Sequence, residues 1–169
     1  MILHPFPPLF DARSKILILG SFPSVRSREE QFFYGHPQNR FWPLLARLLG
    51  EETPQTIEAK KRLMLSHGVA LWDTVAACDI VGSADASIEN AVPNDLGRIL
   101  WRADIRQIFC NGKTAYQLYL RHLADVLGQN AIALPSTSPA NAAWSADKLF
   151  EAWQIILPYL TDPPEGARG

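Results

Sequence analysis

Short apolar runs alternate along the chain with longer segments in which apolar residues recur every three or four positions. The runs are bounded by glycine or polar clusters and predict buried strands at residues 15–20, 69–74, 105–112 and 130–138. The longer segments predict helices at about residues 39–49, 56–68, 94–103, 113–128 and 145–160. Strands alternating with helices favour parallel pairing through right-handed crossovers. The fold predicted is therefore of the α/β class, a three-layer α/β/α sandwich on a short, mainly parallel four-stranded sheet.

The ends of these helices carry recognisable signals. Gly50 and Gly68 follow the first two helical segments and predict their ends, while Asn94 and Ser145 are suitable N-caps. The proline-rich start, "HPFPPLF", predicts an extended arm packed over the core. We expect one domain over residues 1–160 and a flexible tail over residues 161–169.

Composition narrows the classes of partner. The 169 residues are 47% hydrophobic and carry a formal net charge of -1, so there is no overall basic field. Residues 1–50 hold six basic and three acidic side chains, an excess of three positive charges. That local excess permits an anionic ligand near this end of the chain.

Cysteine and histidine usage indicates neither a disulfide framework nor a metal centre. Cys78 and Cys110 are the two cysteines, and the four histidines form no ligand-like pair. We expect reduced thiols, no metal and no cofactor. No apolar run approaches the ~20 residues that span a bilayer, so we expect a cytoplasmic protein, associated with the nucleoid if the cell is prokaryotic.

The carboxyl ends of parallel strands meet at one edge of a sheet, where ligands bind in such folds. The segments "GSFPSVRS", "WDTVAACD", "CNGK" and "LPSTSPAN" follow the four predicted strands. In the first, Gly20 permits close approach of a ligand and three serines offer hydroxyls. An ordinary turn is the alternative, and neither a P-loop nor a dinucleotide fingerprint is present.

The other strand ends are equally open to two interpretations. The hydroxyls of "LPSTSPAN" suit phosphate oxygens, but a solvated loop has the same composition. Asp73 could accept a hydrogen bond from a base N–H group or from a structural amide. Asn111 with Gly112 is first of all a turn pair. From these residues alone, the chain is an α/β domain with a polar cleft.

Residues 35–42, "GHPQNRFW", set polar residues directly against Phe41 and Trp42. Together with "ILGSFPSVRS", "LPSTSPAN", "ALWDTVAACD…GSADASI" and "IFCNGKTAY", this segment resembles the uracil-DNA glycosylase superfamily, and within it the hypoxanthine-DNA glycosylase group. The resemblance covers about residues 14–157. It implies hydrolysis of the N-glycosidic bond of a flipped, deaminated base in double-stranded DNA, by a monomer that leaves an intact abasic strand. Hypoxanthine is the base implied first, with xanthine and uracil as alternatives.

The resemblance also implies roles for individual residues. The asparagine of "PQN" is the essential side chain of the group, which makes Asn39 the catalytic residue; a helix cap is its alternative role. The base would lie against Tyr34, with Phe41 and Trp42 anchoring the loop in the core. The implied base-binding residues are Gly20, Ser21, Phe22, Tyr34 and Asp73, and the implied DNA-binding residues are Ser24, Lys113, Ser136, Ser138, Ala140 and Asn141.

Two positions depart from the pattern of uracil-specific members. Phe22 stands where those enzymes carry the water-positioning acid or asparagine, and Leu134 stands where they carry a histidine that supports the leaving base. One alternative follows from this departure, an inactive damaged-DNA binding module of the same fold. A separate alternative is a nucleotide or sugar-phosphate binding domain unrelated to DNA repair. No lysine lies where a Schiff base with the sugar would be expected, so the enzyme predicted is monofunctional.

Overall fold

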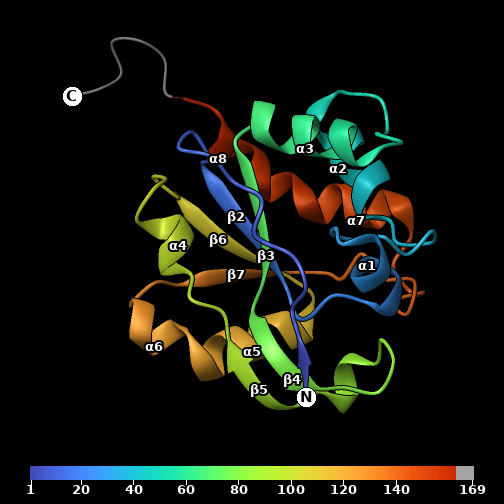
Figure 1. Ribbon diagram of the computed structural model, residues 1–169. Coiled ribbons are helices and arrows are strands. Elements are labelled where there is room, and N and C mark those ends of the chain that lie inside the picture. Colours follow the sequence, from blue (N-terminus) through green and yellow to red (C-terminus); the bar gives the residue numbers. More distant parts are fainter. Residues whose placement is uncertain (163–169) are drawn as a thin grey trace.

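The computed structural model describes residues 1–162 and is built on a central sheet of four parallel strands (Figure 1). The strand order is β3-β2-β6-β7. The strands are β2 (Ile16–Gly20), β3 (Val69–Asp73), β6 (Gln107–Asn111) and β7 (Ala131–Leu134). All four correspond to predicted strands, and every pair is parallel. The predicted fold class is confirmed.

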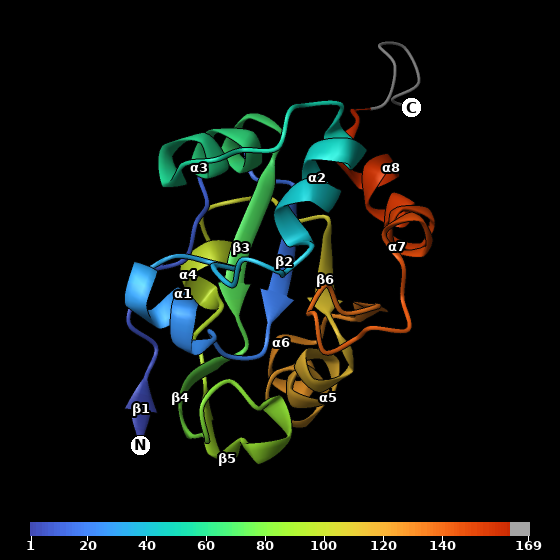
Figure 2. The same ribbon diagram turned by 90° about the vertical axis from the view of Figure 1, so that its right-hand side faces the viewer.

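Helices cover both faces of this sheet, which explains why β2 and β3 are buried along their whole length (Figure 1). One face carries α2 (Phe41–Leu49), α3 (Ile57–Ser66) and α7 (Ala146–Trp153). The other carries α4 (Gly97–Leu100), α5 (Lys113–His122) and α6 (Ala124–Leu127). Turned by 90°, the arrowheads of β2 and β3 point to the same end of the molecule (Figure 2). The loops after the strands therefore gather at that end.

A second, antiparallel sheet was not foreseen from the pattern. It consists of β1 (Ile2–Leu3), β4 (Val75–Asp79) and β5 (Glu89–Pro93), in the order β1-β4-β5. A single residue, Thr74, separates β4 from β3, so the sequence shows no break between the two strands. The strand β5 alternates poorly and is mostly exposed. The helix α1 (Val25–Glu30) and the short 3₁₀ helix η1 (Asp85–Ser87) were also missed, since each is less than two turns long.

Several helix ends are confirmed. The helix α2 ends at Gly50, which adopts the left-handed conformation with a φ of 69°. Thr56 accepts a hydrogen bond from the Ala59 N–H group at the start of α3, and Ser145 caps α7 through the Lys148 N–H group. The predicted arm is present as well, since Leu9 pairs with Leu71 in an isolated antiparallel bridge.

Three helical predictions were too long. The segment predicted at 94–103 holds only the four-residue helix α4, and Asn94 does not cap it: its side-chain amide donates to the Asp73 carbonyl oxygen at 2.8 Å. The segment at 113–128 breaks at Leu123, which has a φ of -126°. The last segment divides into α7, a 3₁₀ turn η2 (Gln154–Ile156) and α8 (Leu157–Leu160). Apolar periodicity continues through these breaks, which is why it did not locate them.

At the carboxyl end, Asp162 accepts hydrogen bonds from Arg106 and Lys15. The rest of the predicted tail lies outside the described residues. Among the helices of residues 1–162, none is long and apolar enough to cross a membrane.

Candidate active site

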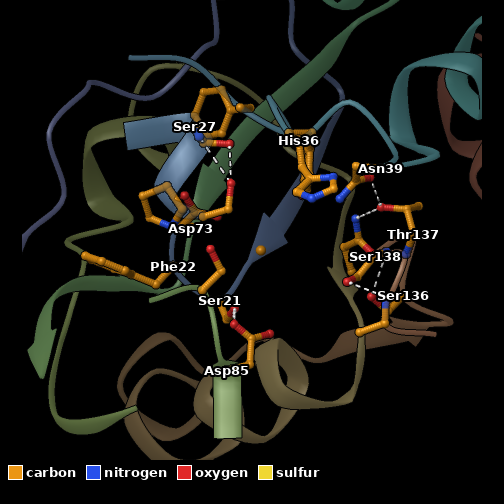
Figure 3. A pocket seen from close by; sticks show the side chains of 18 of the residues that line it. Ser21, Phe22, Ser27, His36, Asn39, Asp73, Asp85, Ser136, Thr137 and Ser138 are labelled. Carbon is orange, nitrogen blue, oxygen red and sulfur yellow. Dashed lines mark hydrogen bonds between the residues drawn. The ribbon is translucent and has the colours of Figure 1, made fainter. Parts of the chain in front are cut away.

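A pocket of about 360 Å³ opens at the carboxyl ends of β2, β3 and β6 (Figure 3). Its volume lies within the usual range for small-molecule sites. The loop after β2, Asp73 at the end of β3 and Asp85 form one wall, and the loop after β7 with Asn39 forms the opposite wall. Ten of the twelve predicted site residues line it: Gly20, Ser21, Phe22, Ser24, Tyr34, Asn39, Asp73, Ser136, Ser138 and Ala140.

Gly20 lines the pocket at a point where the Asp73 carboxylate and the Tyr34 hydroxyl both approach it closely. A Cβ atom added there would collide with Asp73 Oδ1 and lie 3.3 Å from the Tyr34 hydroxyl oxygen. Glycine is therefore required by close approach and not by backbone conformation. Its role in binding a base stays a prediction.

Tyr34 is held rigidly on one side of the pocket. Its ring stacks on Phe41, with centroids 3.9 Å apart and planes inclined by 23°. Its backbone has a positive φ of 54°, which is uncommon for a large residue and typical of functional loops. Burial, and then the negative charge of Asp73, raise the pKa of Tyr34 well above its usual range. The hydroxyl is therefore neutral. It is buried and makes no hydrogen bond of good geometry among the described residues, and Asn111 is the nearby polar side chain that offsets part of the rise in its pKa.

Phe41 and Trp42 anchor this loop, as predicted. Both are buried, and the Trp42 indole N–H donates to the Phe33 carbonyl oxygen at 3.1 Å. Phe22 is buried too, beside the pocket, with the Arg28 guanidinium over its ring. Leu134 is buried at the end of β7 and brings no polar group to the site.

Asp73 is a buried carboxylate with a partner that the sequence did not reveal. His4, from the N-terminal arm, lies with Nε2 2.7 Å from Asp73 Oδ2. The Phe6 N–H group points at His4 Nδ1, so that nitrogen is an acceptor and Nε2 is the donor. The second carboxylate oxygen, Oδ1, is the one nearest Gly20. Asp73 thus combines the two alternatives: it has a structural partner and also lines the pocket.

A second carboxylate, Asp85, was missed by sequence reasoning. It accepts a hydrogen bond from the Ser21 hydroxyl at 2.8 Å (Figure 3). Partial burial raises the pKa of its carboxyl, Ser21 lowers it, and the charge of Asp73 raises it further. The loop that carries Asp85 is fixed by Arg28, which donates to the Gly82 carbonyl oxygen, and by Ser83, which accepts from the Val25 N–H group. The segment "GSADASI" thus carries a polar wall of the pocket.

Asn39 lies two residues before the first residue of α2, and it lines the pocket. Its side-chain oxygen accepts hydrogen bonds from the Phe41 N–H group at 3.0 Å and from the Thr137 hydroxyl at 2.8 Å. Thr137 is bound in turn by the side chain of Asn111. The N-cap position of α2 is Arg40, whose side chain makes no cap bond, so Asn39 accepts the Phe41 N–H group from one residue before the cap. This contact does not remove Asn39 from the pocket.

Arg40 connects the two loops that sequence analysis had considered separately. Its guanidinium donates to carbonyl oxygens of the loop after β7, those of Thr137, Ser138, Asn141 and Trp144. Its own N–H group donates to Thr137 as well, at 3.1 Å. The arginine next to Asn39 thereby fixes the backbone of "LPSTSPAN" against "GHPQNRFW".

The polar residues predicted to meet DNA also bond locally. Ser136 accepts from the Ser138 N–H group, and Ser138 accepts from that of Ala140. Ser24 is the N-cap of α1. The Asn141 amide donates to the Ser136 carbonyl oxygen, so this residue braces the loop and does not line the pocket. Ala140 is exposed at the rim, and Lys113 is exposed at the start of α5, outside the pocket.

The described residues that line the pocket include neither a lysine nor an arginine. Within residues 1–162, no group of three or more histidine, cysteine, aspartate or glutamate side chains could hold a metal ion. The pocket therefore offers hydroxyl and amide groups, the imidazole of His36, two carboxylates and an aromatic face.

Comparison with known protein families identifies the family of this chain. The family model for the uracil DNA glycosylase superfamily matches residues 7–160. The chain belongs to the uracil DNA glycosylase superfamily. The resemblance noted on its motifs is thereby confirmed.

Relatives within this superfamily cover nearly the whole chain. A protein of Methanosarcina acetivorans named hypoxanthine DNA glycosylase is 34% identical over 161 residues, which are 93% of this chain and 99% of that protein. One of Methanosarcina barkeri with the same name is 34% identical over 141 residues, 80% of this chain and 86% of the relative. The solution structure of a candidate uracil DNA glycosylase from M. acetivorans superposes with a TM-score of 0.80 at 33% identity. It covers 95% of this chain and 99% of its own.

Proposed function

We propose that this protein is a monofunctional DNA glycosylase that hydrolyses the N-glycosidic bond of a deaminated base in double-stranded DNA, with hypoxanthine as its first substrate. The observation that carries the proposal is that Tyr34, Asn39 and Asp73 line one pocket. It is supported by relatives that carry the name hypoxanthine DNA glycosylase and align with almost the entire chain. Xanthine and uracil remain the alternative bases to be tested.

The base must leave the helical stack, because the bond to be cut cannot be reached inside a duplex. Once flipped, it would lie on the face of Tyr34, which Phe41 supports from behind. The carboxylate of Asp73 accepts hydrogen bonds but cannot donate when ionised. It suits the N1–H group of hypoxanthine, whereas adenine has an acceptor at the same position. Asp73 is thus the residue that would reject the normal purine.

Bond cleavage would be dissociative. The bond from C1′ to the base nitrogen breaks, its electron pair stays on the base, and the sugar becomes cationic. Water then adds to C1′ and loses a proton. Fixed donors near the base stabilise the negative charge in the transition state, and DNA phosphates stabilise the cation. The described pocket has no lysine that could form a Schiff base with the sugar, so the product would be an intact strand with an abasic site.

The rim of the pocket would bind the DNA backbone. Ser136 and Ser138 retain hydroxyl protons that can be donated to phosphate oxygens. The Ser24 hydroxyl donates to Ser27 at 3.1 Å, so Ser24 would exchange that bond for a phosphate oxygen. Lys113 adds a positive charge nearby, and the exposed Ala140 would enter the minor groove as a small wedge. One chain supplies all of these residues, so we propose a monomer. In a cell without a nucleus, a DNA substrate would place this activity in the cytoplasm.

A duplex with a single deoxyinosine tests the proposal. After incubation with the protein, hot alkali should cut the strand at the inosine, while the same sample without alkali should stay intact. A matched duplex with adenine at that position is the control. Cleavage without alkali would contradict the monofunctional mechanism, and an uncut strand after alkali would contradict glycosylase activity on hypoxanthine.

One observation favours a second function, that of an inactive damaged-DNA binding module. Phe22 and Leu134 replace two polar positions that serve catalysis in uracil-specific members of the superfamily. Asn39→Ala separates the two functions. Loss of base release with unchanged affinity for the inosine duplex supports the enzyme, and a wild-type protein that binds this duplex tightly but releases no base supports the module.

A further inference from the structure

Asn39 is held in a single orientation by a chain of hydrogen bonds. A carbonyl oxygen has two lone pairs, and both of those on Asn39 Oδ1 are used, by the Phe41 N–H group and by the Thr137 hydroxyl. The Phe41 N–H group can only donate, so it must face the oxygen of the amide and not its nitrogen. This contact alone excludes the flipped amide.

A second backbone N–H group fixes the other end of this chain of hydrogen bonds. The Thr137 N–H group donates to Asn111 Oδ1 at 3.1 Å, so the Asn111 nitrogen must be the atom that faces the Thr137 hydroxyl, at 3.0 Å. The hydroxyl oxygen therefore accepts from Asn111 and its proton is directed to Asn39. Thr137 is fully buried, where no solvent competes for these bonds.

These hydrogen bonds decide which atoms of Asn39 can bind a ligand in the pocket. With Oδ1 occupied, the NH₂ group is the part of Asn39 left to face a ligand, and it has no hydrogen-bond partner within residues 1–162. An NH₂ group donates and cannot accept. Donation to a departing base stabilises the charge that gathers on it. Donation to a water molecule would instead occupy one of its two lone pairs and make the other a weaker nucleophile for attack on C1′.

We propose that Thr137, fixed by Asn111, is a positioning residue that turns the NH₂ group of Asn39 toward the flipped base, so that Asn39 assists departure of the base and does not orient water. This inference rests on the glycosylase function proposed above. It assigns roles to Thr137 and Asn111, which sequence reasoning had considered a loop hydroxyl and a turn residue.

Three variants test the positioning role by single-turnover rates on the inosine duplex. Thr137→Val keeps the shape but removes the donor, and should slow base release on the order of 10-fold to 100-fold with little change in duplex affinity. Thr137→Ser keeps the hydroxyl and should restore the rate to within about threefold of wild type. Asn111→Asp keeps the acceptor for the Thr137 N–H group but attracts the Thr137 proton away from Asn39, and should be slow like Thr137→Val.

The role of the donor is tested by changing the base. Xanthine leaves as a more stable anion than hypoxanthine, so it needs less help from a donor. The rate ratio of wild type to Thr137→Val should therefore be smaller with deoxyxanthosine than with deoxyinosine. An equal ratio for the two bases would overturn the assignment of Asn39 to the leaving base.

The measurements distinguish failure of the glycosylase function from failure of the positioning role. A wild-type protein that releases no base refutes the glycosylase function itself. An active wild type whose rate is unchanged in both Thr137→Val and Asn111→Asp refutes only the positioning role. Thermal unfolding of each variant checks folding, and Asn111→Asp supplies the answer if Thr137→Val does not fold.

Discussion

His4 Nε2 lies 2.7 Å from Asp73 Oδ2, and both side chains are almost completely buried, with 4% and 6% of their surface exposed. The two residues are 69 positions apart and come from the N-terminal arm and the end of β3. The arm therefore does more than cover the core. Within residues 1–162, it supplies the one side-chain donor that holds the Asp73 carboxylate in place.

Replacing His4 should uncouple this pair. His4→Ala leaves the buried Asp73 carboxylate without its donor, which should lower the free energy of unfolding by about 2–3 kcal/mol. His4→Gln offers an amide donor in a similar place and should recover a good part of that loss. Denaturant unfolding measures both. His67→Ala is the control, since His67 pairs with Glu51 in a more exposed contact and its loss should cost about 1 kcal/mol or less. Equal losses in His4→Ala and His67→Ala would argue against a structural role for the buried pair.

The Tyr34 hydroxyl is buried without a partner among the described residues, whereas the ring is stacked on Phe41. Tyr34→Phe should therefore keep base release and raise stability by about 1 kcal/mol, since the cost of a buried unsatisfied group is removed. Tyr34→Leu removes the flat aromatic face and should weaken binding of the inosine duplex by about 1–3 kcal/mol. Fluorescence anisotropy with labelled duplex gives the affinities. Similar affinities for the two variants would mean that the base does not stack on this ring.

Arg40 bridges four carbonyl oxygens of the loop after β7, a geometry that suits a guanidinium and not a single ammonium group. Arg40→Lys should lower the free energy of unfolding by about 2 kcal/mol and slow base release, because the loop carrying Thr137 loses its support. Arg62→Lys, at an exposed position of α3, should change stability by less than about 0.5 kcal/mol. A wild-type rate in Arg40→Lys would show that this loop is held by other contacts.

Much of the fold could be predicted because it depends on local pattern. The four parallel strands are continuous apolar runs, and the caps at Thr56 and Ser145 and the stop at Gly50 lie within a turn of the helix that they end. The second sheet could not be predicted, since β1 pairs with β4 across more than 70 residues and β5 has little apolar alternation. Long-range pairing of weak strands leaves no local signal.

Some residues of the site could likewise be predicted from local sequence, and others could not. Gly20, Tyr34 and Asn39 stood out because their neighbours in the sequence are unusual, and they line the pocket. His4, Asp85 and Arg40 were missed, since their roles depend on partners between 64 and 104 residues away. Asn111 was assigned to a turn on the strength of the following glycine, and its side-chain bonds to Thr137 appear only when two loops meet in space.

The two carboxylates Asp85 and Asp79 should respond to pH in opposite directions. The pKa of Asp85 is raised above its ordinary value of 3.8, mainly by burial. The folded protein therefore holds this proton more tightly than the unfolded chain does. The stabilisation is fully present below pH 3.8 and is lost as the pH rises through the raised value. Asp85→Asn keeps an acceptor for Ser21 and cannot ionise, so it should raise Tm at pH 7 and give no gain near pH 3.

Asp79 supplies the matched comparison with the opposite sign. It is exposed, and its pKa is lowered, first by the hydrogen bond from Asn90 and then by the N-terminal amine. Its contribution to stability is present above pH 3.8 and disappears as the pH falls through the lowered value. Asp79→Asn should therefore lower Tm slightly at pH 7 and converge on wild type in acid. Calorimetric scans of both variants between pH 3 and pH 7 measure these differences. A fall in Tm at pH 7 for Asp85→Asn would mean that its charged form has a partner in the folded pocket, and Asp85 would then join Asp73 as an ionised acceptor for the base.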